Sequence, residues 1–339
     1  MTMKNSIVAS IVFCFGLFLF TRAVLAQGTF TVNFGSLGMD TPELPAWLAK
    51  ETGIFEKNGL DVRIVYLVGG PTAVATLISG DTPLTHVSGV AVVRSNLRGS
   101  DAVFVAAGTV KPDFWLMTRR DIKTAAQLKG GAIGIGRFGG INDFILDFLL
   151  PKLGLTPGKD VAIVQAGGVP DRLSALETGR LQATLLSPPV SFIAQKKGFN
   201  VLADVVAMGM AFQHTAVVTT RKFIREHPDV VRRYVKSQIE SVHRLKTDRE
   251  TGIRVLAKYM RGLQDREILE KAYDRSVTDD MLPPKQYPTL EGIKTILAGL
   301  VKEEPKAKLA KPEDFVDATF VNELDRNGFI DNLYNSSKK

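Results

Sequence analysis

The sequence has almost no cysteine. Its only thiol, Cys14, lies inside an apolar N-terminal stretch that we expect to be removed, and it does not stand at the end of that stretch, where a lipoprotein cysteine would. The chain that remains could form no disulfide and offers no cysteine metal site. We therefore expect an ordinary hydrophobic core to stabilise the protein.

Histidine is also scarce. The four histidines, His86, His214, His227 and His243, share no metal-ligand spacing, so we expect no metal site. Ser88 and Ser187 lack the GxSxG context of a nucleophile, and we interpret both as hydrogen-bond donors. His86 alternates with its strand neighbours and is expected to be packed. These residues give no catalytic set and no cofactor site, so the sequence does not predict an enzyme.

A concentrated basic face is missing as well. The formal net charge is +8, and it falls to about +6 if Lys4 and Arg22 leave with the N-terminal stretch. The remaining basic residues are scattered and have acidic residues nearby in the sequence. Nucleic-acid binding favours a concentrated basic patch, so we predict no nucleic-acid partner and only a modest attraction for anions.

Beyond the N-terminus no apolar run is long enough to span a membrane, which takes about 20 residues. Residues 1–26 read as a secretory signal: Lys4 provides the positive start, Ile7 to Phe20 the apolar region, and a small-residue cleavage site ends at Ala26. The alternative is a retained anchor. Roughly 313 residues would follow, enough for two lobes of ordinary domain size.

The most informative feature is an internal echo at a spacing of 99 residues. Residues 65–88 align without a gap with residues 164–187. Both segments predict a strand, a glycine turn, a helix with proline in its first turn, a glycine stop and a second strand. The residue types that recur 99 positions later are Val65, Gly69, Pro71, Leu77, Gly80, Thr85 and Ser88. Two such units predict two similar α/β lobes, although any two βαβ segments share some likeness.

Hydrophobic period and chain breakers predict how the lobes are assembled. Residues 27–117 begin the first lobe, residues 118–215 form the second, and the apolar run at Ala216 to Thr219 returns the chain to the first, which ends at residue 339. We expect links near residues 115–120 and 210–218. From Arg221 onward the pattern is helical, and these helices are expected to pack on the first lobe.

The chain resembles the periplasmic solute-binding proteins of ABC importers, in the sulfonate, nitrate and taurine group that includes thiamine-pyrimidine-synthase-like domains. The likeness covers residues 30–220 best, and it departs from the family at Pro83 and Gln182, where an aspartate is common. The fragments that carry it are Trp47 to Val62, Leu77 to Gly80, Ala126 to Gly130, Leu153 to Leu155 with Asp160-Val161, and Ala175 to Gly179.

This resemblance implies a two-lobe (type II) binding-protein fold with a ligand cleft between the lobes, a periplasmic location, and an inner-membrane permease as partner. We expect a monomer that binds a small solute. Ligands of open α/β sheets lie beyond the carboxyl ends of strands, near helix N-termini. The residues in such places are Gly38, Met39, Gly69, Gly70, Ser88, Gly89, Thr109, Lys111, Arg137, Phe138, Gly139, Ser187, Pro188, Gln213 and His214.

One glycine-rich segment is ambiguous. Residues 134–139 match GxGxxG between a strand and a helix, which could indicate a dinucleotide, yet no acidic residue ends the following strand. We favour a loop whose N–H groups and helix dipole hold an anionic or polar group, with Arg137 as a charged contact. Arg137 could instead face solvent at the rim. Trp115 and Phe138 could stack on a planar solute, or belong to the core.

Two functional hypotheses of different class remain. The first is a transport receptor that captures an anionic or aromatic organic solute by lobe closure and delivers it to a permease. The second is an enzyme of the pyrimidine-synthase branch, whose cytosolic setting and metal-binding cysteines do not match an export signal and a chain without further cysteine. A periplasmic sensor, or a binding protein of a non-ABC importer, is a third alternative.

Overall fold

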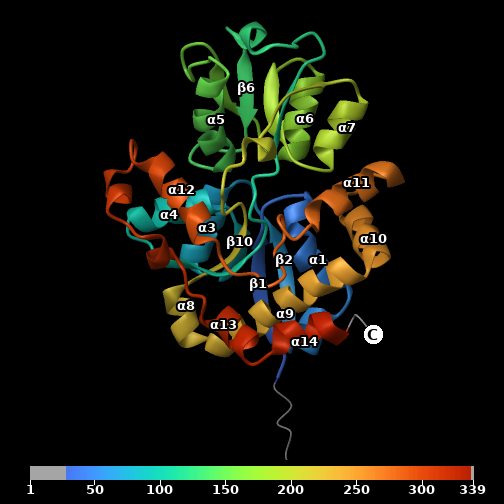
Figure 1. Cartoon of the computed structure of the whole chain (residues 1–339), viewed down its shortest axis with the longest axis vertical. Coiled ribbons are helices and arrows are strands. Elements are labelled where there is room, and N and C mark those ends of the chain that lie inside the picture. The colour runs from blue at the N-terminus through green and yellow to red at the C-terminus, as the bar shows by residue number, and fades with distance from the viewer. Residues whose placement is uncertain (1–27, 337–339) are drawn as a thin grey trace, which may run out of the picture.

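The computed structural model describes residues 28–336, and the expected signal at residues 1–26 lies outside them. The chain forms two lobes, each built on a mixed five-stranded sheet flanked by helices (Figure 1). The strand orders are β2-β1-β3-β10-β4 and β7-β6-β8-β5-β9. The strands are β1 (Phe30–Ser36), β2 (Leu60–Tyr66), β3 (Leu84–Val87), β4 (Ala102–Ala107), β5 (Trp115–Thr118), β6 (Ala132–Ile135), β7 (Ala162–Gln165), β8 (Ala183–Leu186), β9 (Asn200–Asp204) and β10 (Ala216–Thr220).

The helices cover both lobes and form the whole C-terminal region. Figure 1 shows α9, α13 and α14 along the base of the first lobe. The α-helices are α1 (Leu44–Glu51), α2 (Ile54–Lys57), α3 (Gly70–Ser79), α4 (Gly89–Leu97), α5 (Ile141–Lys152), α6 (Val169–Glu177), α7 (Val190–Lys196), α8 (Arg221–Glu226), α9 (Pro228–Thr247), α10 (Arg249–Tyr259), α11 (Arg266–Ser276), α12 (Leu290–Leu300), α13 (Thr319–Arg326) and α14 (Phe329–Ser336). No helix within residues 28–336 is both long and apolar enough to cross a bilayer.

The two echo segments fold alike, one in each sheet. Helices α3 and α6 both carry proline in the first turn, and Gly80 and Gly179 follow them at φ 86° and 76°, a region that glycine enters without steric cost. The likeness extends to single hydrogen bonds. Thr85 Oγ1 donates to the carbonyl of Gly35 at 2.9 Å, and Thr184 Oγ1, 99 residues later, donates to the carbonyl of Gly134 at the same distance.

The chain crosses between the lobes at residues 108–114 and 205–215. Trp115 pairs with Leu186 and with Asp204, so β5 already belongs to the second sheet, whereas the sequence pattern assigned residues up to 117 to the first lobe. An apolar strand alone does not reveal which sheet it joins. The return strand β10 begins at Ala216 and inserts antiparallel between β3 and β4.

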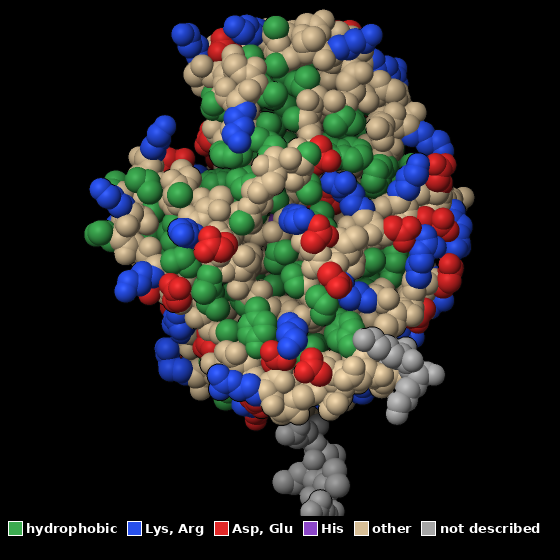
Figure 2. All heavy atoms as spheres, viewed as in Figure 1, with side chains coloured by type: hydrophobic (Ala, Val, Ile, Leu, Met, Phe, Trp, Pro, Cys, Tyr) green, Lys and Arg blue, Asp and Glu red, His purple; other side chains and the backbone are tan. Residues whose placement is uncertain are grey.

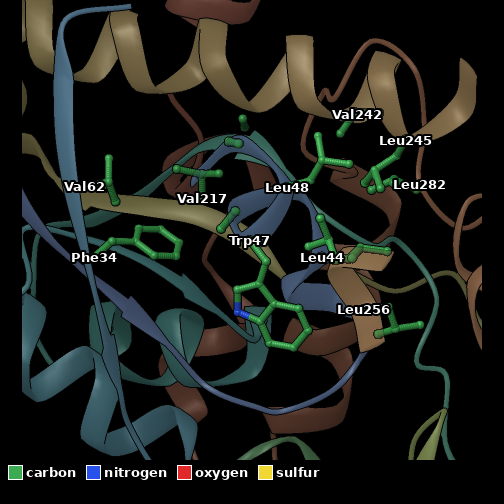
Figure 3. Packing of buried hydrophobic residues seen from close by; sticks show 14 of the residues in the cluster. Phe34, Leu44, Trp47, Leu48, Val62, Val217, Val242, Leu245, Leu256 and Leu282 are labelled. Carbon is green, nitrogen blue, oxygen red and sulfur yellow. The ribbon is translucent and has the colours of Figure 1, made fainter. Parts of the chain in front are cut away.

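The largest hydrophobic core lies between the first sheet and the C-terminal helices. Helix α9 packs on α1, α2 and β2, and α10 also packs on α1. Figure 3 shows Leu48 of α1 beside Val242 and Leu245 of α9, whereas the ring of Trp47 points away from that helix. Both of these α9 side chains are fully buried. Burial of such side chains contributes about 1.5–3 kcal/mol each. The α/β class, the two lobes and the helical C-terminal region are thus confirmed.

Candidate functional site

A cavity of about 90 Å³ lies at the junction of the lobes. Its walls come from the loops after β1, β2, β6 and β7, from the starts of α3, α5 and α6, and from both crossing segments. Strand ends and helix N-termini therefore meet here, as the sequence led us to expect. The lining residues are Leu37, Gly38, Asp40, Pro42, Glu43, Val68, Gly69, Gly70, Ser88, Phe114, Gly136, Arg137, Gly140, Ile141, Asn142, Gly167, Gly168, Val169, Arg172, His214 and Thr215.

Arg172 is the deepest cation of this lining. It lies in the first turn of α6 and is 3% exposed. Its two terminal nitrogens donate to the carbonyls of Gly167, at 2.9 Å, and Leu185, at 3.1 Å. Burial lowers the pKa of Arg172 to about 10, so the guanidinium stays charged near neutral pH. Its third nitrogen, Nε, has no hydrogen-bond partner among the described residues.

Two further buried polar groups of the cavity are also unpaired. Asn142, in the first turn of α5, accepts a long 3.4 Å hydrogen bond from the Gly136 N–H, but its Nδ2 has no partner within residues 28–336. The same holds for Ser88 Oγ, which precedes α4 in the first lobe. A buried polar group without a partner costs about 1–3 kcal/mol. Three such groups belong to residues from both lobes that line one cavity, which makes it the candidate site.

The first lobe contributes two carboxyl groups. Glu43 accepts hydrogen bonds from Ser36 Oγ at 2.9 Å and from the Leu37 N–H at 3.3 Å, and His86 Nδ1 lies 3.5 Å from it. Asp40 accepts one from Ser187 Oγ at 2.8 Å. Burial, assisted by the negative charge of Glu43, raises the pKa of Asp40 to about 7. Asp40 therefore changes its charge near neutral pH.

The two crossing segments are tied to each other beside the cavity. The N–H groups of His214 and Thr215 both donate to the carbonyl of Thr109 at 3.1 Å. His214 Nδ1 lies 2.9 Å from the carbonyl oxygen of Lys111 and 3.2 Å from Thr109 Oγ1. Burial lowers the pKa of His214 to about 4, so its ring is neutral at ordinary pH. His86, as expected, is packed, with its ring edge against Phe34.

The lobes are closed over the cavity. Arg137 Nε, in the second lobe, donates to the carbonyl of Val68 in the first at 3.2 Å, and the Thr41 N–H donates to the carbonyl of Pro188 at 3.4 Å. Phe144 of α5 also inserts into the hydrophobic cluster of the first lobe that contains Phe212. These contacts can form only when the lobes approach each other.

The structure brings six of the predicted site residues to the cavity. They are Gly38, Gly69, Gly70, Ser88, Arg137 and His214. Ser187 and Pro188 do not line it. Ser187 is a hydrogen-bond donor, as expected, and bonds to the lining residue Asp40, while the Pro188 carbonyl accepts from the Thr41 N–H. Arg137 is exposed and reaches the rim. Its contact with a solute stays a prediction.

The other predicted residues have different positions. Three of them, Gln213, Gly89 and Thr109, pack in or against the crossing segments. Gln213 Nε2 donates to the Thr215 carbonyl at 2.6 Å. A Cβ on Gly89 would lie 2.6 Å from the Gln213 carbonyl oxygen. Lys111 pairs with Asp280. The remaining three line other hollows: Met39 beside Trp47 and Tyr66, and Phe138 with Gly139 on an outer groove along α3 and α4.

The sequence reasoning missed Asp40, Glu43, Asn142 and Arg172. A usable signal existed for two of them. Arg172 is the fourth residue after the glycine turn Gly167-Gly168, and Asn142 is the second after the glycine loop that ends at Gly140. Positions in the first turn of a helix that starts beyond a strand face the ligand side of a sheet. No sequence signal of this kind points to Asp40 or Glu43.

The face of the molecule drawn in Figure 2 carries no large patch of a single charge sign. Lysine and arginine side chains are interspersed with aspartate and glutamate over it. Residues 28–336 contain no group of three or more histidine, cysteine, aspartate or glutamate side chains arranged to hold a metal ion.

The sequence matches known proteins over most of its length. The family model described as NMT1/THI5 like matches residues 41–246. The candidate binding protein YtlA of Bacillus subtilis (strain 168) is 21% identical over 280 residues, which cover 79% of this chain and 84% of YtlA.

Solved structures show the same fold. The ligand-binding component of an ABC-type import system from Staphylococcus aureus, solved with zinc bound, superposes with a TM-score of 0.71 at 16% identity, covering 87% of this chain and 98% of that one. The alkanesulfonate-binding protein SsuA from Xanthomonas axonopodis pv. citri, bound to MOPS, gives 0.68 at 17% identity, with the same coverage. The predicted type II binding-protein fold is thereby confirmed.

Proposed function

The chain belongs to the NMT1/THI5-like family, and we propose that it is the solute-binding receptor of an ABC importer. In this proposal the protein acts outside the cytoplasm as a monomer. It captures a small organic solute between its lobes and delivers it to a permease in the membrane. The ligand-binding component from Staphylococcus aureus and the alkanesulfonate-binding protein support this choice, since both share the fold over almost their whole length.

The observation that carries the proposal is the set of three unpaired polar groups on residues that line one cavity between the lobes. Arg172 Nε and Asn142 Nδ2 come from the second lobe and Ser88 Oγ from the first. A solute that accepts hydrogen bonds from all three groups would satisfy them only when the lobes are closed. Its binding energy would therefore favour the closed arrangement over the open one.

Lobe closure needs a hinge, and the crossing segments are suited to that role. They are short, they lie side by side, and backbone hydrogen bonds at Thr109 hold them together. Hinges are typically a few residues that absorb changes in φ and ψ while the bodies stay rigid. We assign the hinge to residues 108–114 and 205–215.

We propose binding without chemistry at this site. His214 Nδ1 lies within hydrogen-bond distance of the Lys111 carbonyl and Thr109 Oγ1, and a pKa of about 4 makes it a poor base at neutral pH. The alternative is an enzyme of the pyrimidine-synthase kind, which would return an altered solute. Mass spectrometry of the solute recovered after incubation separates the two: a receptor returns it unchanged.

The proposal is tested by a thermal-shift screen with small sulfonates, carboxylates, nitrate, pyrimidines and aromatic acids. A true solute raises the unfolding free energy by about 2.7 kcal/mol at a hundredfold excess over Kd. The same solute should make the protein more compact in small-angle scattering. Tight binding without compaction would overturn lobe closure, and the absence of any stabilising solute would overturn the receptor assignment.

Arg172→Met, which removes the deep cation, should abolish the stabilisation. Arg180→Met is the matched control, because Arg180 follows the same helix but is exposed, with its Nε 3.3 Å from Thr178 Oγ1. Equal loss of binding in both variants would count against the cavity as the binding site.

A further inference from the structure

The chain leaves each sheet in the same way, once in each lobe. Strand β1 ends at Ser36, whose carbonyl accepts a hydrogen bond from the Leu67 N–H at 2.9 Å. Strand β6 ends 99 residues later at Ile135, whose carbonyl accepts one from the Ala166 N–H at the same distance. At both strand ends the carbonyl therefore still bonds to the neighbouring strand's continuation.

The next N–H along the chain bonds to a side chain instead. The Leu37 N–H donates to Oε1 of Glu43 at 3.3 Å. The Gly136 N–H donates to Oδ1 of Asn142 at 3.4 Å. In both cases the acceptor lies six residues after the donor, and the two acceptors are again 99 residues apart. All four residues line the cavity, so the repeated hydrogen bond lies at the candidate site in both lobes.

The polar surroundings of the two acceptors differ as their chemistry requires. Glu43 is 1% exposed, and its Oε2 accepts from Ser36 Oγ at 2.9 Å and lies 3.5 Å from His86 Nδ1. The residues 99 positions after these two neighbours are apolar, Ile135 and Leu185. A buried carboxylate needs several donors around it, whereas the oxygen of a neutral amide needs fewer. The polar neighbours are thus present in the lobe whose acceptor is a carboxylate.

We propose that Glu43 and Asn142 are counterpart positioning residues. Each holds the first backbone N–H beyond its strand and so sets the course of a loop that lines the cavity, residues 37–40 in the first lobe and 136–140 in the second. An N–H that a side chain already holds is withdrawn from the solute. Both residues therefore act on the solute through the backbone that they hold.

The two loops also carry contacts between the lobes. Asp40 accepts a hydrogen bond from Ser187 Oγ at 2.8 Å, and Arg137 Nε donates to the carbonyl of Val68 at 3.2 Å. A displaced loop would lose part of the closed arrangement together with its part of the cavity wall. Solute affinity should therefore depend on the two acceptors. This consequence rests on the receptor function proposed above, whereas the arrangement of the loops does not.

The first test separates the hydrogen bond from the size of the Glu43 side chain. Glu43→Gln keeps an acceptor for the Leu37 N–H, and Glu43→Met has a similar length and no such acceptor. The measurement is residue-specific amide exchange by NMR in the solute-free protein. Exchange at Leu37 should be at least about tenfold faster in Glu43→Met and close to wild type in Glu43→Gln, since an unpaired N–H exchanges faster. Exchange at Gly136 should change in neither variant.

Glu56→Met is the matched control, because it removes an exposed carboxylate on α2 of the same lobe. It should leave the exchange of both amides at wild-type rates. Equal exchange at Leu37 in Glu43→Gln and Glu43→Met, or faster exchange throughout the first sheet instead of at the loop, would overturn the inference.

The second lobe provides an independent pair of variants. Asn142→Asp keeps the acceptor and places an acid in the first turn of α5, where the helix dipole favours it, while Asn142→Leu has a similar volume and no acceptor. Exchange at Gly136 should be faster in Asn142→Leu alone, and exchange at Leu37 should stay at the wild-type rate. This pair carries the test if Glu43→Met fails to fold. Equal exchange at Gly136 in the two variants would overturn the inference.

Solute affinity provides the last readout. With the solute found by the thermal-shift screen, Glu43→Met should bind at least about tenfold more weakly than the wild type and Glu43→Gln within about threefold, because a loosened loop must be ordered on binding. If the amides respond as expected and no solute stabilises the protein, the positioning role stands and the receptor function is contradicted. If the solute binds Glu43→Met as tightly as the wild type, the receptor function stands and the inference is wrong.

Discussion

Ser187 Oγ of the second lobe donates a 2.8 Å hydrogen bond to Oδ2 of Asp40 in the first lobe. This bond joins the two lobes at a residue that lines the cavity between them. Because burial raises the pKa of Asp40 to about 7, the charge of the acceptor depends on pH in the range in which the protein would work. Closure of the lobes and the protonation of Asp40 are therefore coupled.

The first prediction concerns stability and pH. Asp40 has a raised pKa in the folded protein, whereas an unfolded aspartate titrates near 3.9. Between about pH 4 and pH 7 the folded protein keeps a proton that the unfolded chain releases, so the unfolding free energy falls as the pH rises through this window. Asp40→Asn cannot ionise and should be more stable than the wild type at pH 8, by roughly 1–2 kcal/mol after allowance for partial exposure.

At pH 3 the same comparison should show almost no difference, since Asp40 of the wild type is then largely protonated in both the folded and the unfolded state. Thermal unfolding of the solute-free proteins at the two pH values measures this. A gain of equal size at both pH values would mean that burial of the Asp40 charge is not its cause.

The second prediction concerns Arg172. Arg172→Met removes the deep cation and the donors to the carbonyls of Gly167 and Leu185. Loss of one partner of a buried charged contact typically costs about 2–5 kcal/mol, so affinity for an anionic solute should fall at least thirtyfold. Titration calorimetry, with circular dichroism to verify the fold, tests this. Near wild-type affinity in a folded variant would contradict the assignment.

The third prediction concerns Arg137. If the solute carries an anionic group near the rim, Arg137→Ala should weaken binding at least tenfold, and the unliganded melting temperature should hardly change because the side chain is exposed. A purely aromatic solute predicts little effect from this change. Phe138→Ala serves as the control in either case, because Phe138 lines an outer groove and not the cavity. Titration of both variants with the screened solute decides between these cases, and wild-type affinity of Arg137→Ala would exclude a charged contact there.

The fourth prediction concerns closure at a distance from the solute. A Cβ on Gly299 of α12 would lie 2.5 Å from the ring of Phe144, which the second lobe inserts into the first. Gly299→Ala should favour helix α12 by up to about 1 kcal/mol and yet hinder the closed arrangement. We expect an unchanged or higher melting temperature, severalfold weaker binding and less compaction in small-angle scattering.

Lys294→Ala, at an exposed position of the same helix, is the control for helix propensity alone. It should leave both affinity and compaction at wild-type values. If Gly299→Ala binds solute normally, Phe144 adapts without loss and the contact does not govern closure.

The sequence predicted the lobes well because the echo is a local pattern. Its strand, turn and helix signals depend on neighbouring residues, and even the hydrogen bonds of Thr85 and Thr184 repeat. The cavity was predicted only in part. Backbone turns such as Gly69-Gly70 could be placed at strand ends, but Asp40 meets Ser187 across 147 residues of sequence, and no local pattern encodes that encounter.

Arg137 and Arg172 illustrate the same limit. Both follow strands of the second lobe, and the glycine-rich context drew attention to Arg137. The two side chains differ in burial, since Arg172 is 3% exposed while Arg137 reaches solvent. Burial depends on how the closed lobes fit together, which is a property of tertiary packing.

The position of β10 has a consequence for the order of folding. The second lobe is one uninterrupted stretch, β5 to β9, whereas the first sheet lacks its fourth strand until residues 216–220 insert between β3 and β4. Pairing of strands so far apart in the chain is slow because the loop must close first. The lobe that comes later in the sequence should therefore acquire protection from hydrogen exchange first, and the N-terminal strands should remain exchangeable until the chain has returned.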